Sequence, residues 1–403
     1  MITLQEAMAI IQENRLTGGK ELVPLSDALD RVIAEDLAAP EPSPRFTNSA
    51  MDGFAVIWKD VESVVSGQSV VLSIVGESRA GVPFDGKLDK GKAIKISTGA
   101  MVPSEANTVI PIEDVDVLDN SIRVREVKKM NQHVRFRGEE FEDGEIVLRK
   151  GRWITPAHIG LLASLGVNSV PVYKKPRISI LVTGTELVSV DDKIKPWQIR
   201  DSNGQMLLAA TNSSGAQSVS IEKAGDRLED IKVKIDDMSA RSDIILISGG
   251  VSGGPHDLVK QAAWESGFET LFWKVRQKPG KPLFVAKKSK ILLYGLPGNP
   301  VSALTCYLNY VHPIIQNMLG MEFLWESIDG VLAKQITNSS DRIRFLNICF
   351  EITGNGKPCI HVLEKQNSHM LTTIVQADGF ILLDPGGTLK KGEMVDVYQY
   401  PWK

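Results

Sequence analysis

The chain contains 403 residues, of which 43% are hydrophobic and 24% charged, and its formal net charge is -3. A chain of this length is expected to form about two to four domains. The small negative charge provides no global basic field, which argues against nucleic acid or an anionic membrane surface as the main partner. The first residues lack the basic and apolar regions of a secretory signal, and no apolar run of about 18 residues occurs. We therefore expect a cytoplasmic protein with no membrane segment.

Cysteine and histidine usage argues against several kinds of metal or disulfide site. The three cysteines form no CxxC pair, and the six histidines show no HxxxH spacing. A disulfide framework, a zinc knuckle and a histidine-built transition-metal site are therefore not expected. We expect Cys306, Cys349 and Cys359 to be small buried hydrophobic side chains.

The N-terminal region is expected to form helices over residues 4–14 and 26–38, with Ser26 as the N-cap of the second. The sequence PEPSP at residues 40–44 cannot continue a helix, because proline lacks the backbone N–H and fixes φ. It predicts a stiff extended linker into a new unit. A further helix is expected over residues 156–165, and the glycine that follows it can adopt the left-handed conformation that commonly ends a helix. We expect this helix to pack with the first two.

Short β-branched runs separated by glycine-bearing turns predict two regions of β structure. The first region, after the linker, has such runs at residues 70–75, 93–97 and 108–112. The second, after about residue 329, has runs at 345–352, 360–363 and 395–398 and turns at 354–356 and 386–387. The first predicts a small β-barrel or β-rich insert, and the second a small C-terminal β domain.

The region between residues 176 and 320 alternates apolar strands with helices. The predicted strands are 178–182, 218–221, 244–247 and 291–294, and the predicted helices are 202–213, 226–238, 257–267 and 301–318. Such alternation predicts βαβ units and a largely parallel sheet. The predicted fold class is therefore multi-domain, α/β plus β.

Unusual loops follow three of these strands, at the sheet edge where open parallel sheets bind ligands. They are TGTEL at 183–187, SGGVSGG at 248–254 with Asp257 at the entry of the next helix, and GLPGNP at 295–300. Four glycines in the second loop exceed what a turn requires, which favours close approach of backbone to an anion. The alternative for the third loop is ordinary turn chemistry, with Asn299 as an N-cap followed by proline.

Two other charged patterns leave alternatives open. Asp226 and Glu229 match a capping box as well as they match a site carboxylate. Lys274, Arg276 and Lys278 have a period of two, which would place three cations on one face of an extended segment and suit an oxyanion. A positively charged edge strand explains the same pattern.

Taken in order, these motifs resemble the MoeA family of molybdopterin molybdenumtransferases, whose enzyme domain also occurs in gephyrin. The resemblance covers nearly the whole chain. Its carriers are NSAMDG at 48–53, STGA at 97–100, GEE at 138–140, TGTEL at 183–187, DSN at 201–203, SGGVSGGPHD at 248–257, KPGKP at 278–282 and GLPGNP at 295–300. The first of these would be only a turn if it stood alone.

The resemblance implies an enzyme of molybdenum cofactor biosynthesis. It would insert molybdate into adenylated molybdopterin with magnesium-dependent release of AMP, as a homodimer with a MogA-like adenylyltransferase as a candidate partner. The implied domains are an elongated linker and dimerisation domain at residues 1–44 and 138–174, which is helical and discontinuous, an inserted β domain at 45–137, a MogA-like three-layer α/β domain at 175–322 and a C-terminal β-barrel at 323–403.

The resemblance also implies the site residues. The catalytic set is Asp52, Glu186, Asp257, Lys274 and Lys278. Glu186 and Asp257 are the candidate magnesium ligands, and the two lysines would offset charge on the leaving AMP. The substrate-binding set is Thr98, Glu140, Asp226, Ser248, Gly249, Gly250, Ser252, Pro297, Gly298 and Pro300. Asp52, Thr98 and Glu140 precede the α/β domain, so we expect a site shared between domains and between two subunits.

Departures from the family pattern leave two rival interpretations. Thr185 stands where the family usually has Asp, and Glu140 also replaces Asp. A scaffold protein that kept the fold without catalysis would tolerate such losses. An enzyme that uses only the MogA-like domain, such as the competence-damage proteins or a pterin adenylyltransferase, is the other alternative. The NSAMDG insert argues against the latter.

Overall fold

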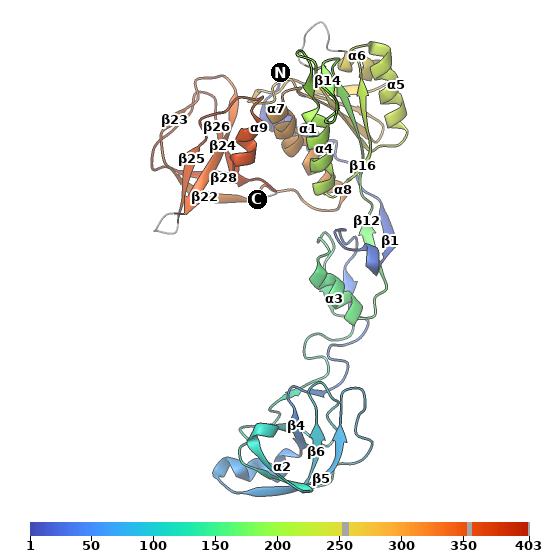
Figure 1. The fold of residues 1–403 in the computed structure, drawn as a ribbon, viewed down its shortest axis with the longest axis vertical. Helices are drawn as coiled ribbons and strands as arrows, with labels where there is room; N and C mark the ends of the chain where they lie inside the picture. The colour runs from blue at the N-terminus through green and yellow to red at the C-terminus, as the bar shows by residue number, and fades with distance from the viewer. Residues whose placement is uncertain (252–257, 353–356, 402–403) are drawn as a thin grey trace. The chain divides into compact units, whose positions relative to one another are not determined.

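The computed structural model describes residues 1–251, 258–352 and 357–401. The chain divides into two compact units, which are described separately (Figure 1). The first comprises Met1–Glu35, Lys150–Ile159 and Asn168–Lys403, and the second comprises Asp36–Arg149 and Gly160–Val167. Within the described residues, no helix has both the length and the apolar character needed to cross a membrane.

A six-stranded sheet forms the centre of the first unit. Its strands in spatial order are β16 (Gln217–Ala224), β13 (Arg177–Thr183), β17 (Ile244–Ser248), β21 (Ile291–Leu296), β20 (Phe284–Lys288) and β18 (Glu269–Trp273). The first four strands are parallel, which confirms the predicted βαβ alternation. β20 and β18, which the sequence patterns did not reveal, extend the sheet with antiparallel pairings.

Helices cover both faces of this sheet and produce three layers (Figure 1). One face packs against α5 (Leu228–Ser239) and α6 (Val259–Glu265). The other packs against α1 (Leu4–Glu13), α4 (Ser202–Ser213) and a helical run made of α7 (Pro300–Cys306), the π-helical turn η4 (Tyr307–Val311) and α8 (His312–Met318). The predicted helices of this region are therefore confirmed. α1 joins the core of the sheet through Leu4, Ala7 and Ile11.

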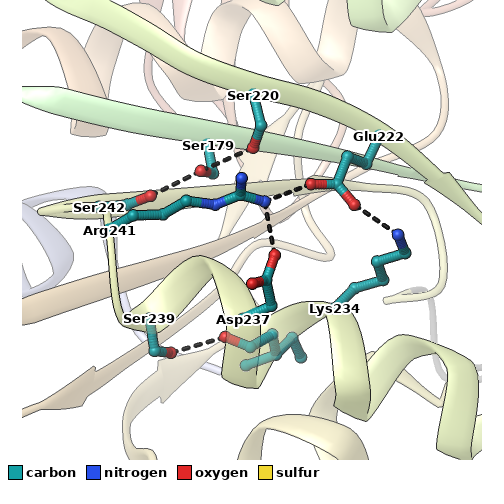
Figure 2. Close-up of polar contacts among 9 residues, drawn as sticks. Ser179, Ser220, Glu222, Lys234, Asp237, Ser239, Arg241 and Ser242 are labelled. Carbon is teal, nitrogen blue, oxygen red and sulfur yellow. Dashed lines mark hydrogen bonds and ion pairs between the residues drawn. The ribbon is translucent and has the colours of Figure 1, made fainter.

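A charged cluster fastens the edge strand β16 to α5 (Figure 2). Glu222 on β16 accepts hydrogen bonds from Lys234 at 2.6 Å and from Arg241, which also donates to Asp237 at 2.6 Å. The Lys234 hydrogen bond is the main cause that lowers the pKa of the Glu222 carboxyl below its ordinary value. The Glu222 side chain is only 20% exposed, so its two ion pairs are partly shielded from solvent.

The C-terminal part of the first unit is a closed β-barrel, as predicted. Five strands form the ring in the order β24 (Ile343–Ile352), β25 (Pro358–Val362), β22 (Ser327–Leu332), β28 (Met394–Gln399) and β26 (Gly379–Leu383), which pairs back to β24. The short pair β23 (Ile336–Thr337) and β27 (Thr388–Leu389) and helix α9 (Leu371–Gln376) flank it. The predicted turn at 354–356 lies outside the described residues, whereas Gly386 has φ of 69° at the predicted turn at 386–387.

One strand of the barrel sheet comes from the α/β domain. β19 (Gln277–Lys278) leaves the loop before β20 and pairs in parallel with the start of β24. This pairing brings a loop of the α/β domain next to residues of the barrel, and it is important for the site described below.

The predicted helix over residues 26–38 is wrong. Only Leu25–Asp27 forms a single 3-10 turn, η1, and Leu37–Ala38 forms the short strand β2. Val32 and Ile33 instead make isolated β-bridges to Trp153 and Val172, and Asp30 has φ of 57°, which interrupts any helix. Tertiary pairing therefore overrides helix propensity here. Beside it, β1 (Lys20–Pro24) pairs with β12 (Ser169–Tyr173).

The second unit has a six-stranded sheet at its centre, in agreement with the predicted β-rich insert. Its strands in order are β7 (Thr108–Pro111), β4 (Gly53–Val56), β6 (Lys92–Ile96), β5 (Val70–Ser78), β9 (Ser121–Val124) and β8 (Val115–Leu118). The shorter elements are β3 (Asn48–Ser49), β10 (Val134–Arg135), β11 (Ile146–Leu148), α2 (Trp58–Val61), η2 (Glu62–Ser66) and η3 (Ile112–Asp114). Helix α3 (Pro156–Ser164) is present as predicted, and Gly166 with φ of 69° follows it.

Candidate functional site

Three loops converge where the parallel strands β13, β17 and β21 end. Asn203, in the first turn of α4, connects two of these loops to each other. Its Nδ2 donates to Ser248 Oγ at 2.8 Å and to the carbonyl oxygen of Gly298 at 2.7 Å. Asp201 caps the same helix by accepting the N–H of Gly204 at 2.8 Å, which fixes the position of Asn203. The DSN motif thus holds the loops of the site together.

The glycines that follow β17 are required by close backbone packing. Gly249 has φ of 98°, and a Cβ there would lie 2.8 Å from both the carbonyl oxygen and Oγ1 of Thr183. Gly250 has φ of 65°, where side chains other than glycine are strained. These positions support the interpretation that this loop is more than a turn.

A cavity of about 600 Å³ lies at this sheet edge, and we call it the carboxylate cavity. Its acidic lining residues are Glu186, Asp201 and Asp226. Of the site residues predicted from sequence, it collects Glu186, Asp226, Ser248, Gly249, Gly250, Gly298 and Pro300. The predicted convergence of the strand-end loops is therefore present in the structure.

The capping-box alternative for Asp226 is wrong. Helix α5 begins one residue later, its N-cap is Arg227, and no side chain caps it. Asp226 instead accepts hydrogen bonds from the N–H of Thr185 at 3.3 Å and from its hydroxyl at 3.2 Å. Thr185, the position where the family usually has Asp, thus orients a neighbouring carboxylate.

A second cavity, of about 560 Å³, adjoins the first, and we call it the cationic cavity. It shares Glu186, Ile199, Gly298 and Asn299 with the carboxylate cavity. Its cationic lining residues are Lys278, Lys281 and Arg342, and Pro297 also lines it. Neither lysine forms an ion pair with a described residue, so their charges are available to an anion. The two cavities together place carboxylates beside uncompensated cations.

The loop that carries these lysines is held by buried polar contacts. Gln277 is fully buried, accepts a hydrogen bond from the Tyr310 hydroxyl and donates to the carbonyl oxygen of Pro279 at 3.1 Å. Gly280 has φ of 94°, and a Cβ there would lie 2.5 Å from Gln277 Nε2 and 2.7 Å from Cys306 Sγ. Burial raises the pKa of the Cys306 thiol, so it is a packing residue and not a nucleophile.

The expectation for the cysteines is correct for Cys306 alone. Cys349 and Cys359 are only half-buried, because they lie toward the exposed ends of β24 and β25. All three thiols are free.

Lys274 does not line either cavity, contrary to the predicted face of three cations. Its φ of 68° interrupts the extended run before Arg276, so the period of two does not continue through it. Its Nζ lies 3.9 Å from the centroid of the Trp273 ring, which Lys260 also approaches, at 3.2 Å. Only Lys278 of the predicted pair belongs to the cavity.

The remaining predicted residues fall into two groups. Asp52, Thr98 and Glu140 belong to the second unit, where Asp52 accepts the N–H of Thr98 at 2.7 Å and Glu140 accepts the Ser43 hydroxyl at 2.6 Å. Ser252 and Asp257 lie outside the described residues. The roles of these five residues remain predictions.

The carboxylate cavity fits magnesium as a substrate-bridged ion. Among the described residues, no three Asp, Glu, His or Cys side chains lie close enough to form a complete metal site. Magnesium is usually bound through one or two carboxylates together with waters and substrate phosphates. Glu186 and Asp226, which line one cavity beside the glycine loop, supply this kind of oxygen donor.

Several residues that line the two cavities were not predicted as site residues from the sequence. Asn299 donates to the hydroxyl of Ser368 at 2.9 Å, and Ser368 and Gln366 line the cationic cavity from the barrel side. Arg342 comes from the residues just before β24. No local pattern identifies Arg342, whereas the DSN motif was a signal that could have identified Asn203.

Comparison with known proteins agrees with this architecture. Family models match residues 2–166 (MoeA N-terminal region, domain I and II), residues 179–317 (probable molybdopterin binding domain) and residues 329–400 (MoeA C-terminal region, domain IV). The molybdopterin molybdenumtransferase of Haemophilus influenzae is 32% identical, over 98% of each chain, and that of Bacillus subtilis is 31% identical, over 100% of this chain and 96% of the relative.

A solved structure, described as the molybdopterin biosynthesis MoeA protein from Pyrococcus horikosii, superposes with a TM-score of 0.84 at 30% identity over 99% of both chains. The likeness therefore covers all the domains and not only the α/β domain. The chain belongs to the MoeA family of molybdopterin molybdenumtransferases.

Proposed function

We propose that this protein inserts molybdenum from molybdate into adenylated molybdopterin and releases AMP, as a molybdopterin molybdenumtransferase of molybdenum cofactor biosynthesis. The observation that carries the proposal is the pair of adjoining cavities at one sheet edge: acidic residues predominate in one, which Arg200 also lines, and cations predominate in the other, which Glu186 also lines. Such a pair fits a reaction between two anions, a phosphate-linked substrate and an oxyanion. The family relationship supports the same reaction.

The cationic cavity is proposed to bind the oxyanion. Its lining supplies three cationic side chains, those of Lys278, Lys281 and Arg342. The two lysines have no ion-pair partner among the described residues, so their charges are available to an anion. Cations fixed in place before the reaction stabilise charge without reorganisation, which is the usual largest contribution to transfer reactions of this kind. Ser302 and Ser368 line the same cavity and supply hydroxyl donors for further oxyanion oxygens.

The carboxylate cavity is proposed to bind the adenylate end with magnesium. Glu186 and Asp226 would hold the ion, together with Asp257 if its carboxylate enters the site. When bound, magnesium would neutralise phosphate charge. The backbone N–H groups of Gly249 and Gly250 are suited to the phosphate oxygens, because glycine allows close approach.

The direct test is an assay of the purified protein with adenylated molybdopterin, magnesium and molybdate. We expect molybdate to stimulate AMP release and molybdenum to appear in the pterin product. Replacing Asp257 by Asn should reduce the magnesium-dependent rate, and an unchanged rate would remove that residue from the site. The absence of any AMP release by the wild-type chain would favour the scaffold interpretation.

A homodimer and a role for Asp52 across its interface are parts of the same proposal. The hydrogen bond from Thr98 N–H fixes the Asp52 carboxylate in one orientation, as expected for a group that contacts substrate. Sedimentation measures the oligomeric state. If Asp52 acts in the partner's site, mixed dimers of Asp52→Asn and Glu186→Gln subunits should recover activity in one of the two sites. Activity no higher than that of either parent variant would contradict the exchange.

A further inference from the structure

A third cavity, of about 320 Å³, lies in the first unit and shares no lining residue with the two site cavities. It is formed around α8, the segment 321–326 that leads into β22, and the residues after β28. We call it the aromatic pocket. Its lining residues are Trp153, Ser213, His312, Gln316, Phe323, Leu324, Trp325, Glu326, Gln399, Tyr400 and Pro401.

Aromatic rings provide much of the wall. His312, Phe323 and Trp325 form a row of edge-to-face contacts, with centroids 4.9 Å and 5.3 Å apart and interplanar angles of 86° and 76°. Trp153 is held in place by Gly215, where a Cβ would come within 2.3 Å of its ring. Aromatic faces carry negative electrostatic potential and attract cations, most strongly in a partly desolvated site.

His312 presents an acceptor without a partner. The side chain is only 8% exposed, and its Nδ1 lies 2.8 Å from the hydroxyl of Ser214. That hydroxyl also lies 2.9 Å from the Tyr307 hydroxyl, and its shortest contact is to the carbonyl oxygen of Ala210 at 2.7 Å. With the single Ser214 hydrogen assigned to this shortest contact, Nδ1 carries the imidazole proton and Nε2 is the acceptor. Nε2 makes no hydrogen bond to a described residue and is not among the fully buried polar atoms that lack a partner, so it is open to solvent or to a ligand in the pocket.

The electrostatics of the pocket favour a cation. Burial lowers the pKa of His312 to about 4, so the imidazole is neutral at pH 7 and keeps its lone pair. Glu326 is the charged residue of the lining, its side chain is exposed, and it has no ion-pair partner among the described residues. No lysine or arginine occurs among the described residues that line the pocket. A bound anion would therefore meet no compensating charge there.

We propose that the aromatic pocket binds a primary organic ammonium ion, whose N–H group donates to His312 Nε2 while its charge faces the tryptophan rings and the carboxylate of Glu326. This ligand class satisfies each unpaired feature: the acceptor nitrogen, the ring faces and the uncompensated carboxylate. The site is separate from the transfer site, so its ligand is neither molybdopterin nor molybdate.

The proposal is tested by isothermal titration of the full chain with benzylammonium chloride at pH 7.5. Benzyl alcohol has the same ring without the charge, and benzyltrimethylammonium chloride has the same ring and charge without an N–H donor. We expect benzylammonium to bind about tenfold more tightly than benzyl alcohol and several-fold more tightly than benzyltrimethylammonium. Equal affinity of benzylammonium and benzyl alcohol would overturn the proposal, because it would show an apolar pocket only.

Three variants test where benzylammonium binds. Glu326→Gln removes the carboxylate from an exposed side chain and should weaken benzylammonium binding about threefold to tenfold. Glu322→Gln removes an exposed carboxylate from the same segment but outside the pocket, and it should leave the affinity unchanged. His312→Phe should abolish the preference for benzylammonium over benzyltrimethylammonium. Equal effects of the two glutamate substitutions, or no binding of benzylammonium by the wild type at 20 mM, would refute the proposal even if His312→Phe fails to fold.

Discussion

Replacing Asn203 by Ala removes the contact that joins the strand-end loops of the carboxylate cavity. The side chain is 8% exposed, and both hydrogens of Nδ2 are used, one by Ser248 Oγ and the other by the carbonyl oxygen of Gly298. Alanine has a higher helix propensity than asparagine, so the substitution should not disrupt α4, but it lacks any hydrogen-bond donor. The loops would then be held only by their own backbone contacts.

The expected cost follows from the two hydrogen bonds. Each neutral hydrogen bond contributes about 1 kcal/mol net, and the Gly298 oxygen lies beside a cavity that water can enter, so the larger penalty for a dry unpaired group does not apply. The local free energy of opening should therefore fall by about 2 kcal/mol, which is about a 30-fold larger opening constant. The free energy of global unfolding should change by less than the free energy of opening these loops.

Hydrogen–deuterium exchange of the loop peptides at 246–251 and 295–300 measures this directly. Asn212→Ala is the matched control, because Asn212 is on the same helix, exposed, and makes no side-chain hydrogen bond to a described residue. Surface changes of this kind are expected to stay within about 0.5 kcal/mol. If Asn203→Ala and Asn212→Ala gave the same exchange rates in these peptides, Asn203 would not be the residue that orders the loops.

Three further outcomes are expected. Burial lowers the pKa of His312 from 6.5 to about 4, so between these pH values the unfolded chain binds more protons than the folded chain. The contribution of His312 to the free energy of unfolding is therefore fully present above pH 6.5, and it falls by about 3 kcal/mol as the pH drops to 4. Urea unfolding of His312→Gln from pH 4 to 7 should lack this pH dependence. Lys278→Gln should raise the molybdate concentration for half-maximal AMP release about tenfold or more, and Lys290→Gln, on an exposed turn, should not. Gly280→Ala should lower the free energy of unfolding by more than about 2 kcal/mol in thermal unfolding, because Gly280 has a positive φ and a Cβ there would lie 2.5 and 2.7 Å from neighbouring side-chain atoms. Gly386 also has a positive φ but faces open space, so Gly386→Ala should lower it by only about 1 kcal/mol.

The sequence predicted the parts of the fold whose signal is local. The parallel strands β13, β17 and β21 were identified because their residues are mostly apolar, whereas β16 is largely polar and was predicted only over residues 218–221. α7 was identified because Asn299 and a proline precede a helical pattern. The antiparallel strands β18 and β20 were missed because charged residues interrupt their apolar runs: β18 begins with Glu269, and β20 ends with Lys287 and Lys288. Residues 26–38 were wrongly assigned because β-bridges to distant residues, which no local pattern encodes, determine their conformation.

The two site cavities also differ in whether local sequence signals or pairing between distant residues determine their lining. Glu186 and Ser248 could be placed together from sequence, because loops at the carboxyl ends of parallel strands meet at one sheet edge. Arg342 could not be placed, since it reaches the site through the pairing of β19 with β24. Lys274 was misplaced because its left-handed conformation breaks the alternation on which the prediction rested.

The contribution of the barrel to the cationic cavity decides against an enzyme built from the α/β domain alone. Three residues of the C-terminal region line the same cavity as Lys278, namely Arg342, Gln366 and Ser368. An α/β domain without the barrel would keep the carboxylates and the glycine loop but would lose the arginine and the Ser368 hydroxyl. It would also lose the β24 partner that positions Gln277 and Lys278. A reaction that needs only an adenylate and magnesium could survive that loss, whereas a reaction that must also bind a second oxyanion could not. The presence of the cationic cavity is therefore the structural reason to prefer metal transfer over adenylation for this chain.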